Sequence, residues 1–306
     1  MKKSIDIDGN IIEYYLIDPT GNITVLVESF VPVENHAYVA KKLMEAEPSC
    51  EQVGFVSIVN ITSPDAFFES ANTWEKLEEV DIKLRMSAGE FCGNATMSTA
   101  ALCCKKAGIS RSESRRVIVD SSGVEDNIEV DIICENYEDD LFSGRVHMPR
   151  PLRIYIGTFD FDGMSFELPV VDFGGISHVI MRNDDESVIR FKDGMSISDE
   201  VLKDKAEKAV KIWCNQIGAE GLGLMFVDDK VSYVNRIEMN PLVFVPGCDS
   251  CFWENSCGSG TTAVGAYFSY VSEENPIELT IAQPGGDLSI EVINNECFLG
   301  GSVKIL

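Results

Sequence analysis

The chain has 306 residues, with 25 Lys or Arg against 50 Asp or Glu, and its formal net charge is -25. This length provides one large domain or two of average size, and it buries enough surface to fold without disulfides or a structural metal. The negative charge repels nucleic acids and anionic membrane surfaces, so we expect neither as a partner.

The N-terminal residues lack the apolar core of a signal peptide, and no apolar run approaches the ~20 residues that span a bilayer. We therefore expect a cytoplasmic protein. Its 10 Cys should then be mostly reduced thiols, each of them a core residue, a metal ligand or a reactive group.

The first half of the chain alternates strand-like and helix-like segments up to a Cys-Gly motif at Cys92. Small residues after that motif predict a helix that is buried on all sides. In chain order, we expect a strand at 21–27, a helix at 34–46, a strand at 53–58, a helix at 95–107, and strands at 117–120 and 128–133.

The second half repeats this order up to a second Cys-Gly motif at Cys257. Its long helix is predicted from apolar residues at helical spacing, namely Val201, Ala206, Ala209, Val210 and Trp213. The expected elements are a strand at 174–180, a helix at 198–217, a strand at 222–227, a helix at 261–270, and strands at 277–281 and 288–293.

Two pairs of short stretches match between the halves. Residues 92–100 resemble residues 257–265, and residues 21–27 resemble residues 174–180. Because both matches occur in the same order at similar spacing, they indicate a duplicated unit. We predict an α+β fold of two pseudo-symmetric domains, each a curled, barrel-like mixed β-sheet around a central helix.

A cysteine just before a helix faces unpaired N–H groups and the positive end of the helix dipole, which should lower its pKa. The following glycine lets a ligand approach the backbone, and a substrate carboxylate would bind the free N–H groups. The residues of the two predicted half-sites are Cys92, Gly93, Asn94, Cys257, Gly258 and Ser259.

Two such cysteines predict racemisation of an amino acid, in which a thiolate on one face of the α-carbon and a thiol on the other exchange a proton. Helix N-termini holding the carboxylate would stabilise the charge that develops as the α-proton leaves. This chemistry requires no pyridoxal lysine, metal or other cofactor. A small-molecule amino acid is the expected ligand of a monomer or homodimer.

With these motifs the chain resembles the diaminopimelate epimerase superfamily of cofactor-independent racemases. Cys92 and Cys257 look like the two catalytic cysteines of that family. Asn22 resembles its substrate-contacting asparagine, and residues 171–179, which include Ser177 and His178, resemble its Gly-Asn-Pro-His strand. These side chains are added to the predicted substrate-binding set.

The resemblance also implies the domain organisation. It favours a diaminopimelate epimerase-like fold with a first half at 1–150 and a second half at 151–306. Arg150-Pro151, near the midpoint of the chain, is the boundary that the sequence itself suggests. The closing segment, about 297–306, resembles the last strand of the family, which returns to the first half.

Departures from the family concern the far end of the substrate. Where diaminopimelate epimerases carry asparagines and an arginine, this chain has Ser87, Gly175-Ile176 and Gly223. Residues 89–96 instead look like the histidine racemase branch. Glu90 and Glu254 are candidates for binding the α-ammonium group by charge alone.

Two alternatives remain: a diaminopimelate epimerase, and a non-catalytic amino-acid-binding or metal-sensing protein of the same fold. Cys248 and Cys251 form a C-x-x-C pair, but a second ligand pair for zinc is missing, so a loop over the site is the simpler interpretation. His178 is equally interpretable as a structural histidine. The cysteines interpreted as core residues are Cys50, Cys103, Cys104, Cys134, Cys214 and Cys297.

Overall fold

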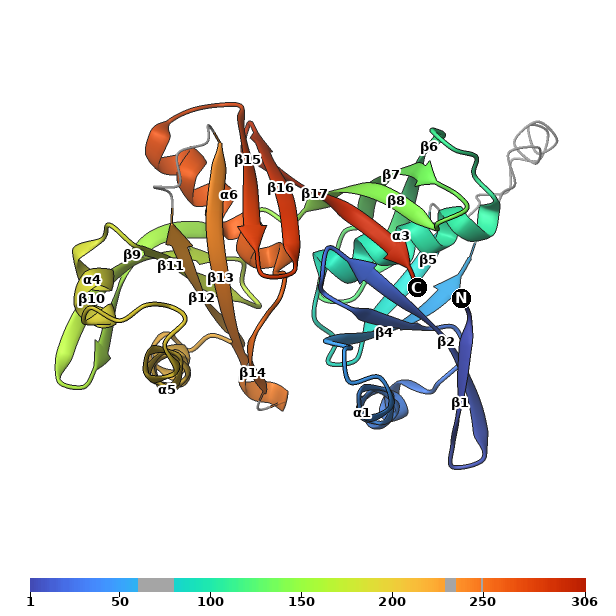
Figure 1. Cartoon of the computed structure of the whole chain (residues 1–306), viewed down its shortest axis with the longest axis horizontal. Coiled ribbons are helices and arrows are strands. Elements are labelled where there is room, and N and C mark those ends of the chain that lie inside the picture. The colour runs from blue at the N-terminus through green and yellow to red at the C-terminus, as the bar shows by residue number, and fades with distance from the viewer. Residues whose placement is uncertain (60–79, 229–234, 249) are drawn as a thin grey trace. The chain divides into compact units, whose positions relative to one another are not determined.

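The computed structural model describes residues 1–59, 80–228, 235–248 and 250–306. The chain forms two compact units, shown in Figure 1. Unit 1 comprises Met1–His147 and Gly300–Leu306, and unit 2 comprises Met148–Leu299. Among the described helices, none has the length and apolar character needed to cross a membrane.

Unit 1 is a closed barrel of eight strands. Its elements are β1 (Lys3–Ile7), β2 (Asn10–Pro19), β3 (Thr24–Val27), η1 (Val33–Asn35), α1 (His36–Ala46), β4 (Gln52–Ile58), β5 (Ile82–Met86), α3 (Gly93–Ala107), β6 (Ser114–Ser121), β7 (Ile128–Asn136) and β8 (Leu141–Met148). Strands β2 to β8 pair in sequence, and the end of β17 (Glu296–Ile305) closes the ring by pairing with β8 and β2. Helix α3 contacts strands β2 to β7, whereas α1 packs on β4 (Figure 1).

Unit 2 has the same organisation. Its elements are β9 (Arg153–Phe161), β10 (Met164–Asp172), β11 (Ser177–Arg182), α4 (Glu186–Lys192), α5 (Glu200–Ile217), β12 (Leu222–Asp228), β13 (Arg236–Val245), η2 (Pro246–Cys248), β14 (Ser250–Trp253), α6 (Gly258–Ser272), β15 (Ile277–Gln283), β16 (Gly286–Ile293) and the start of β17. Helix α6 contacts one face of the sheet, and α5 covers the other face at β12 and β13.

The strand directions of the two units match one for one. From β2 to β7 they run antiparallel, parallel, antiparallel, parallel, antiparallel, and β10, β11, β12, β13, β15 and β16 follow the same series. This agreement, with one helix inside each strand series, confirms the predicted pseudo-symmetric α+β fold.

Local sequence explains the helices. Helix α3 ends at Gly108, whose φ of 71° allows the left-handed cap, and Lys105 and Lys106 lie in its last turn, where the dipole favours cations. Helix α5 buries Trp213 among Phe159, Phe166 and Phe191. The predicted apolar stripe was wrong at one position: Val201 is 69% exposed, and Leu202 is buried instead.

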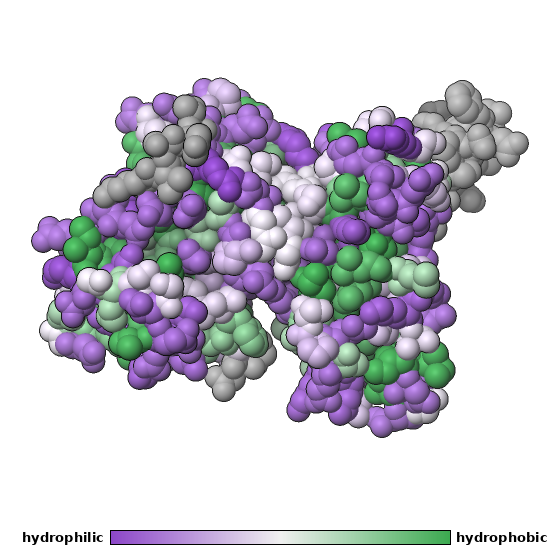
Figure 2. Space-filling model, viewed as in Figure 1, coloured by the Kyte–Doolittle hydropathy of each residue, from purple (hydrophilic) through white to green (hydrophobic). Residues whose placement is uncertain are grey.

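Most predicted elements are confirmed with small shifts at their ends, including both central helices. The sequence did not predict β1, β2, β5, β8, β9, β10, α4, β13 or β14, which lie outside the two repeated stretches. Hydrophilic residues occupy much of the face of each unit seen in Figure 2, as the charge balance requires.

Candidate functional site

Cys92 caps the N-terminus of α3. It has extended backbone angles, and its Sγ accepts a hydrogen bond from the Ala95 N–H at 3.4 Å. The Thr96 hydroxyl donates to the Cys92 carbonyl at 2.8 Å and fixes the first turn from the other side. Gly93 and Asn94, the next two predicted residues, are buried in this turn, while Cys92 itself is half-buried.

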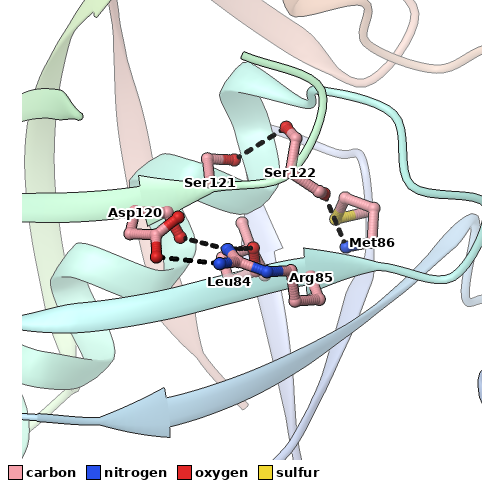
Figure 3. Close-up of polar contacts among 6 residues, drawn as sticks. All are labelled: Leu84, Arg85, Met86, Asp120, Ser121 and Ser122. Atoms are coloured by element: carbon pink, nitrogen blue, oxygen red, sulfur yellow. Dashed lines mark hydrogen bonds and ion pairs between the residues drawn. The ribbon is translucent and has the colours of Figure 1, made fainter. Parts of the chain in front are cut away.

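The loop that leads into Cys92 is held by the end of β6. Ser122 Oγ accepts from the Met86 N–H at 2.9 Å, as Figure 3 shows, and donates to the Glu90 carbonyl at 2.8 Å. Arg85, also in Figure 3, binds the Asp120 carboxylate at 2.8 Å and joins β5 to β6. Gly123 has a φ of 77°, and a Cβ on it would lie 2.2 Å from the Phe91 nitrogen. Only glycine therefore fits against this loop.

Asn22 lies at the same end of the unit 1 barrel. It precedes β3, and Glu51 precedes β4, which runs parallel to β3 in register. Its Nδ2 donates to Glu51 Oε2 at 2.7 Å, and its Oδ1 accepts from Gln52 Nε2. The predicted substrate-binding amide is fully buried and oriented by these two neighbours.

Cys257 caps α6 as Cys92 caps α3. Its Sγ accepts from the Gly260 N–H at 3.3 Å and lies 3.5 Å from the Ser259 hydroxyl. Helix geometry leaves the N–H groups of Gly258 and Ser259 without an intrahelical acceptor, so they can bind an anion. Cys257 is 4% exposed.

A second set of bonds holds the Cys257 backbone. Thr261 Oγ1 donates to the Cys257 carbonyl at 2.7 Å, the counterpart of the Thr96 contact in unit 1. Gln283, at the end of β15, accepts from the Cys257 N–H at 2.8 Å and donates to Thr261 Oγ1 at 3.0 Å. The N–H and the carbonyl of Cys257 are therefore both hydrogen-bonded, which fixes the backbone that carries the thiol.

The predicted lowering of the cysteine pKa was wrong for Cys257. Burial raises the pKa of its thiol well above the usual range, and the negative charge of Glu254, which is hydrogen-bonded to the thiol, raises it further. Ser259 and the Gly260 N–H act in the opposite direction but are outweighed. Desolvation of a thiolate exceeds the stabilisation that one helix end supplies, so Cys257 is held as a thiol. Glu254 thus contacts the thiol, a role that charge alone could not assign.

Ser177 and His178 begin β11 at the same end of unit 2. The Ser177 hydroxyl donates to Asp172 Oδ1 at 3.2 Å. Although desolvation acts to raise it, hydrogen bonds from Gly174 N, Arg153 and Ser177 hold the pKa of Asp172 below its usual value. The Ser177 side chain thus stabilises the loop before β11.

His178 is fully buried, and within the described part of the chain neither ring nitrogen has a hydrogen-bond partner. Burial lowers the pKa of its imidazole to about 3, so the ring is neutral at physiological pH. A Cβ on Gly223 would lie 2.3 Å from His178 Nδ1, and a Cβ on Gly260 would lie 2.3 Å from Met225 Sδ. Two glycines therefore make room for His178 and Met225 beneath the α6 N-terminus.

The described residues contain no group of three or more His, Cys, Asp and Glu side chains that could hold a metal. The C-x-x-C pair cannot be placed, because the Cys248 side chain lies outside the described residues. The six cysteines predicted as core residues are all buried.

Sequence reasoning missed Gln283, Ser122 and Gly123, which position the cysteine loops from distant strands. The threonine four residues after each cysteine was visible, since Thr96 and Thr261 occupy the same place in the matching stretches. A shared hydroxyl at this position is the signal that could have found the carbonyl contact.

Residues 11–300 match the family model of the histidine racemase CntK N-terminal domain. The chain belongs to this histidine racemase family. Similar members include a histidine racemase of Fusobacterium nucleatum, 28% identical over 98% of this chain and 97% of that protein. Another, from Staphylococcus aureus, is 28% identical over 94% of this chain and 90% of that protein. Family membership makes the chain an isomerase of the amino-acid racemase class.

Solved structures share the fold of this histidine racemase family member. A hydroxyproline epimerase from Agrobacterium vitis superposes with a TM-score of 0.63 at 11% identity, covering 96% of this chain and 92% of the other. A phenazine biosynthesis PhzF family protein from Enterococcus faecalis superposes with a TM-score of 0.52 at 16% identity, covering 96% of both.

Proposed function

We propose that this chain interconverts L- and D-histidine without a cofactor, using Cys92 and Cys257 as its two acid–base groups. The observation that carries the proposal is the matched placement of two cysteines, each at the N-cap of a central helix with its Sγ bonded to the backbone N–H three residues on. A binding protein has no need of two such thiols.

The proposed step is a balanced proton exchange. A thiolate removes the α-proton and becomes a thiol, which leaves a carbanion at the α-carbon. The second thiol delivers its proton to the opposite face and becomes a thiolate. The enzyme leaves the reaction with the roles of its two cysteines exchanged, so the reverse reaction uses the same groups.

The helix N-termini would hold the substrate carboxylate. The N–H groups of Gly258 and Ser259, and the equivalent first turn at Gly93 and Asn94, present donors and a positive dipole end. Negative charge spreads from the α-carbon into the carboxylate as the proton leaves, so these donors stabilise the transition state more than the ground state.

The environment of Cys257 supports its role as the acid of the resting enzyme. Its burial and the nearby Glu254 favour the thiol. Cys92 is then the resting base, and turnover in the other direction begins from the reversed pair. Asn22, Ser177 and His178 are proposed to line the substrate from the strand ends of their respective units.

Histidine is proposed as substrate because the matching family and the similar curated proteins are histidine racemases. The loss of the polar groups that would bind a second amino-acid head, at Gly175-Ile176 and Gly223, agrees with a substrate shorter than diaminopimelate.

The test is proton NMR of L-histidine in deuterated buffer with reduced enzyme, alongside L-alanine and L,L-diaminopimelate. We expect loss of the histidine α-proton signal and appearance of D-histidine by chiral chromatography. The Cys92→Ser/Cys257→Ser double variant should do neither. Cys251→Ser, a half-buried cysteine in the same unit that caps no helix, is the matched control and should retain activity. A folded, reduced enzyme that binds histidine without α-proton exchange would instead be a binding protein.

A further inference from the structure

Phe252 is a solvent-exposed aromatic residue of unit 2, 58% exposed, in the short strand β14 that leads to Cys257. Its neighbour Trp253 stacks on Phe226 and packs against the core under α5. Successive residues of a strand point to opposite faces. Phe252 therefore points to the face opposite that core.

The strand register identifies that face. Phe252 pairs with Val243, Val243 with Gly223, and Gly223 with His178, which forms one row across β14, β13, β12 and β11. Residues that pair directly lie on the same face of a sheet. The row thus shares the face on which His178 and Met225 lie and on which α6 packs.

The next row of paired residues across the sheet contains side chains near the Cys257 thiol. Met225 pairs with Pro241, and the Glu254 N–H donates to the Pro241 carbonyl at 3.0 Å. Met225 reaches the α6 N-terminus, where a Cβ on Gly260 would lie 2.3 Å from its Sδ and 3.1 Å from Cys257 Sγ. Phe252 and Glu254 are two residues apart, so their side chains leave the same face about 7 Å from each other.

We propose that Phe252 is a specificity-determining residue whose ring stacks on the planar side chain of the amino-acid substrate. An α-carbon next to Cys257 would place the substrate side chain at the row that contains Phe252. An exposed aromatic ring there offers a flat apolar surface that suits an imidazole and gives little to a methyl group. This inference rests on the proposed function, because it concerns the substrate of the same site.

The experiment compares Phe252→Leu and Phe252→Tyr with the wild type, using L-histidine as substrate and L-alanine as a second substrate or as a competitive inhibitor. Leucine retains apolar bulk but lacks a ring, so we expect KM for L-histidine to rise about 2- to 10-fold with kcat within about twofold. The alanine constant should not change. Phe252→Tyr keeps the ring, so its KM for L-histidine should be close to the wild-type value.

Tyr270→Leu is the matched control. Tyr270 is an exposed aromatic of the same unit, 65% exposed in the last turn of α6, about 20 Å along the helix from Cys257. Its substitution should leave both constants unchanged.

The inference is overturned if Phe252→Leu leaves KM for histidine unchanged, or changes the histidine and alanine constants equally. A wild-type enzyme that exchanges the α-proton only of non-aromatic amino acids also overturns it, while leaving the two-cysteine chemistry standing. Absence of exchange with every amino acid removes the proposed function, and this inference with it. The wild-type measurement thus separates the two failures.

Discussion

The two units hold their cysteines in the same frame but surround them differently. In each, the thiol caps a helix, and a threonine four residues on donates to the cysteine carbonyl, at 2.8 Å in unit 1 and 2.7 Å in unit 2. Unit 1 adds a polar cluster at its strand ends, where the Asn22 amide binds Glu51. At the corresponding end of unit 2, a Cβ on Gly221 would lie 3.4 Å from Ile176 Cγ1.

The thiols themselves differ in exposure. Cys92 is half-buried behind a loop held by Ser122, whereas Cys257 is buried against the carboxylate of Glu254. The comparison indicates that duplication preserved the backbone geometry of the two thiols while their burial diverged. The proposed mechanism, with one acid and one base at rest, would draw on this difference.

Removing either thiol tests the comparison most severely. We expect Cys92→Ser and Cys257→Ser each to lower the racemisation rate about 10²- to 10⁴-fold, the range for loss of a general acid–base group. Each variant retains one thiol on one face, so each should still exchange the α-proton of one histidine enantiomer with deuterated solvent, and the two variants should choose opposite enantiomers. Exchange of the same enantiomer by both variants would contradict equivalent roles for the two cysteines.

The bonds around the cysteine backbone should differ in strength between units. Gln283→Met removes both bonds of the Gln283 amide and leaves the buried Cys257 N–H without its acceptor, which should cost about 1–3 kcal/mol of unfolding free energy. Ser121→Ala, its counterpart in unit 1, removes a 3.5 Å contact with Thr96 and a 3.4 Å bond to the Ser122 carbonyl, leaves the backbone of Cys92 untouched, and should cost less than about 1 kcal/mol. Urea titrations of the two variants measure this difference, and equal losses would show that the two helices are held alike.

One pair of neighbouring strand residues beneath the central helix differs between the units, and this difference should make the stability of unit 2 depend on pH. Unit 1 has Val25 beside Val53 where unit 2 has His178 beside Gly223. The pKa of His178 is about 3 in the folded chain, and its unfolded value is about 6.5. Below about pH 6.5 the unfolded state therefore binds a proton at His178 that the folded state does not bind. The free energy of unfolding falls as the pH decreases below this value.

This histidine should contribute about 2 kcal/mol to the loss of stability between pH 7 and pH 5. His178→Phe keeps a ring but cannot titrate, so its unfolding free energy should fall less over the same range. Chemical denaturation at the two pH values, compared between wild type and variant, checks the sign. Identical pH dependence in wild type and variant would mean that His178 binds its proton as readily in the folded state as in the unfolded state.

The sequence predicted the repeat, the two capping cysteines and the central helices, because each is a local pattern. It did not predict the contacts that distinguish the units. Gln283 lies 26 residues beyond Cys257 and reaches it only because β15 runs beside β13. The high pKa of Cys257 depends on burial, which local sequence does not encode. Charge suggested Glu254 for the substrate ammonium, and only the course of β14 brings it to the thiol.

The smallest expected effect concerns the charge beside Cys257. Glu254→Gln retains a hydrogen-bonding side chain but removes a negative charge. That charge is the second-largest cause of the raised Cys257 pKa, and desolvation is the largest. The pKa of Cys257 should then fall, and the alkaline limb of the kcat/KM profile, where the acid thiol is lost, should move to lower pH. Lys208→Gln, a change to an exposed charge on α5, serves as the control and should leave the profile in place. If the alkaline limb stays in place in Glu254→Gln, the loss of activity at high pH belongs to a group other than Cys257. If the limb shifts with L-histidine as substrate but not with D-histidine, Cys257 is the acid for the L-enantiomer alone.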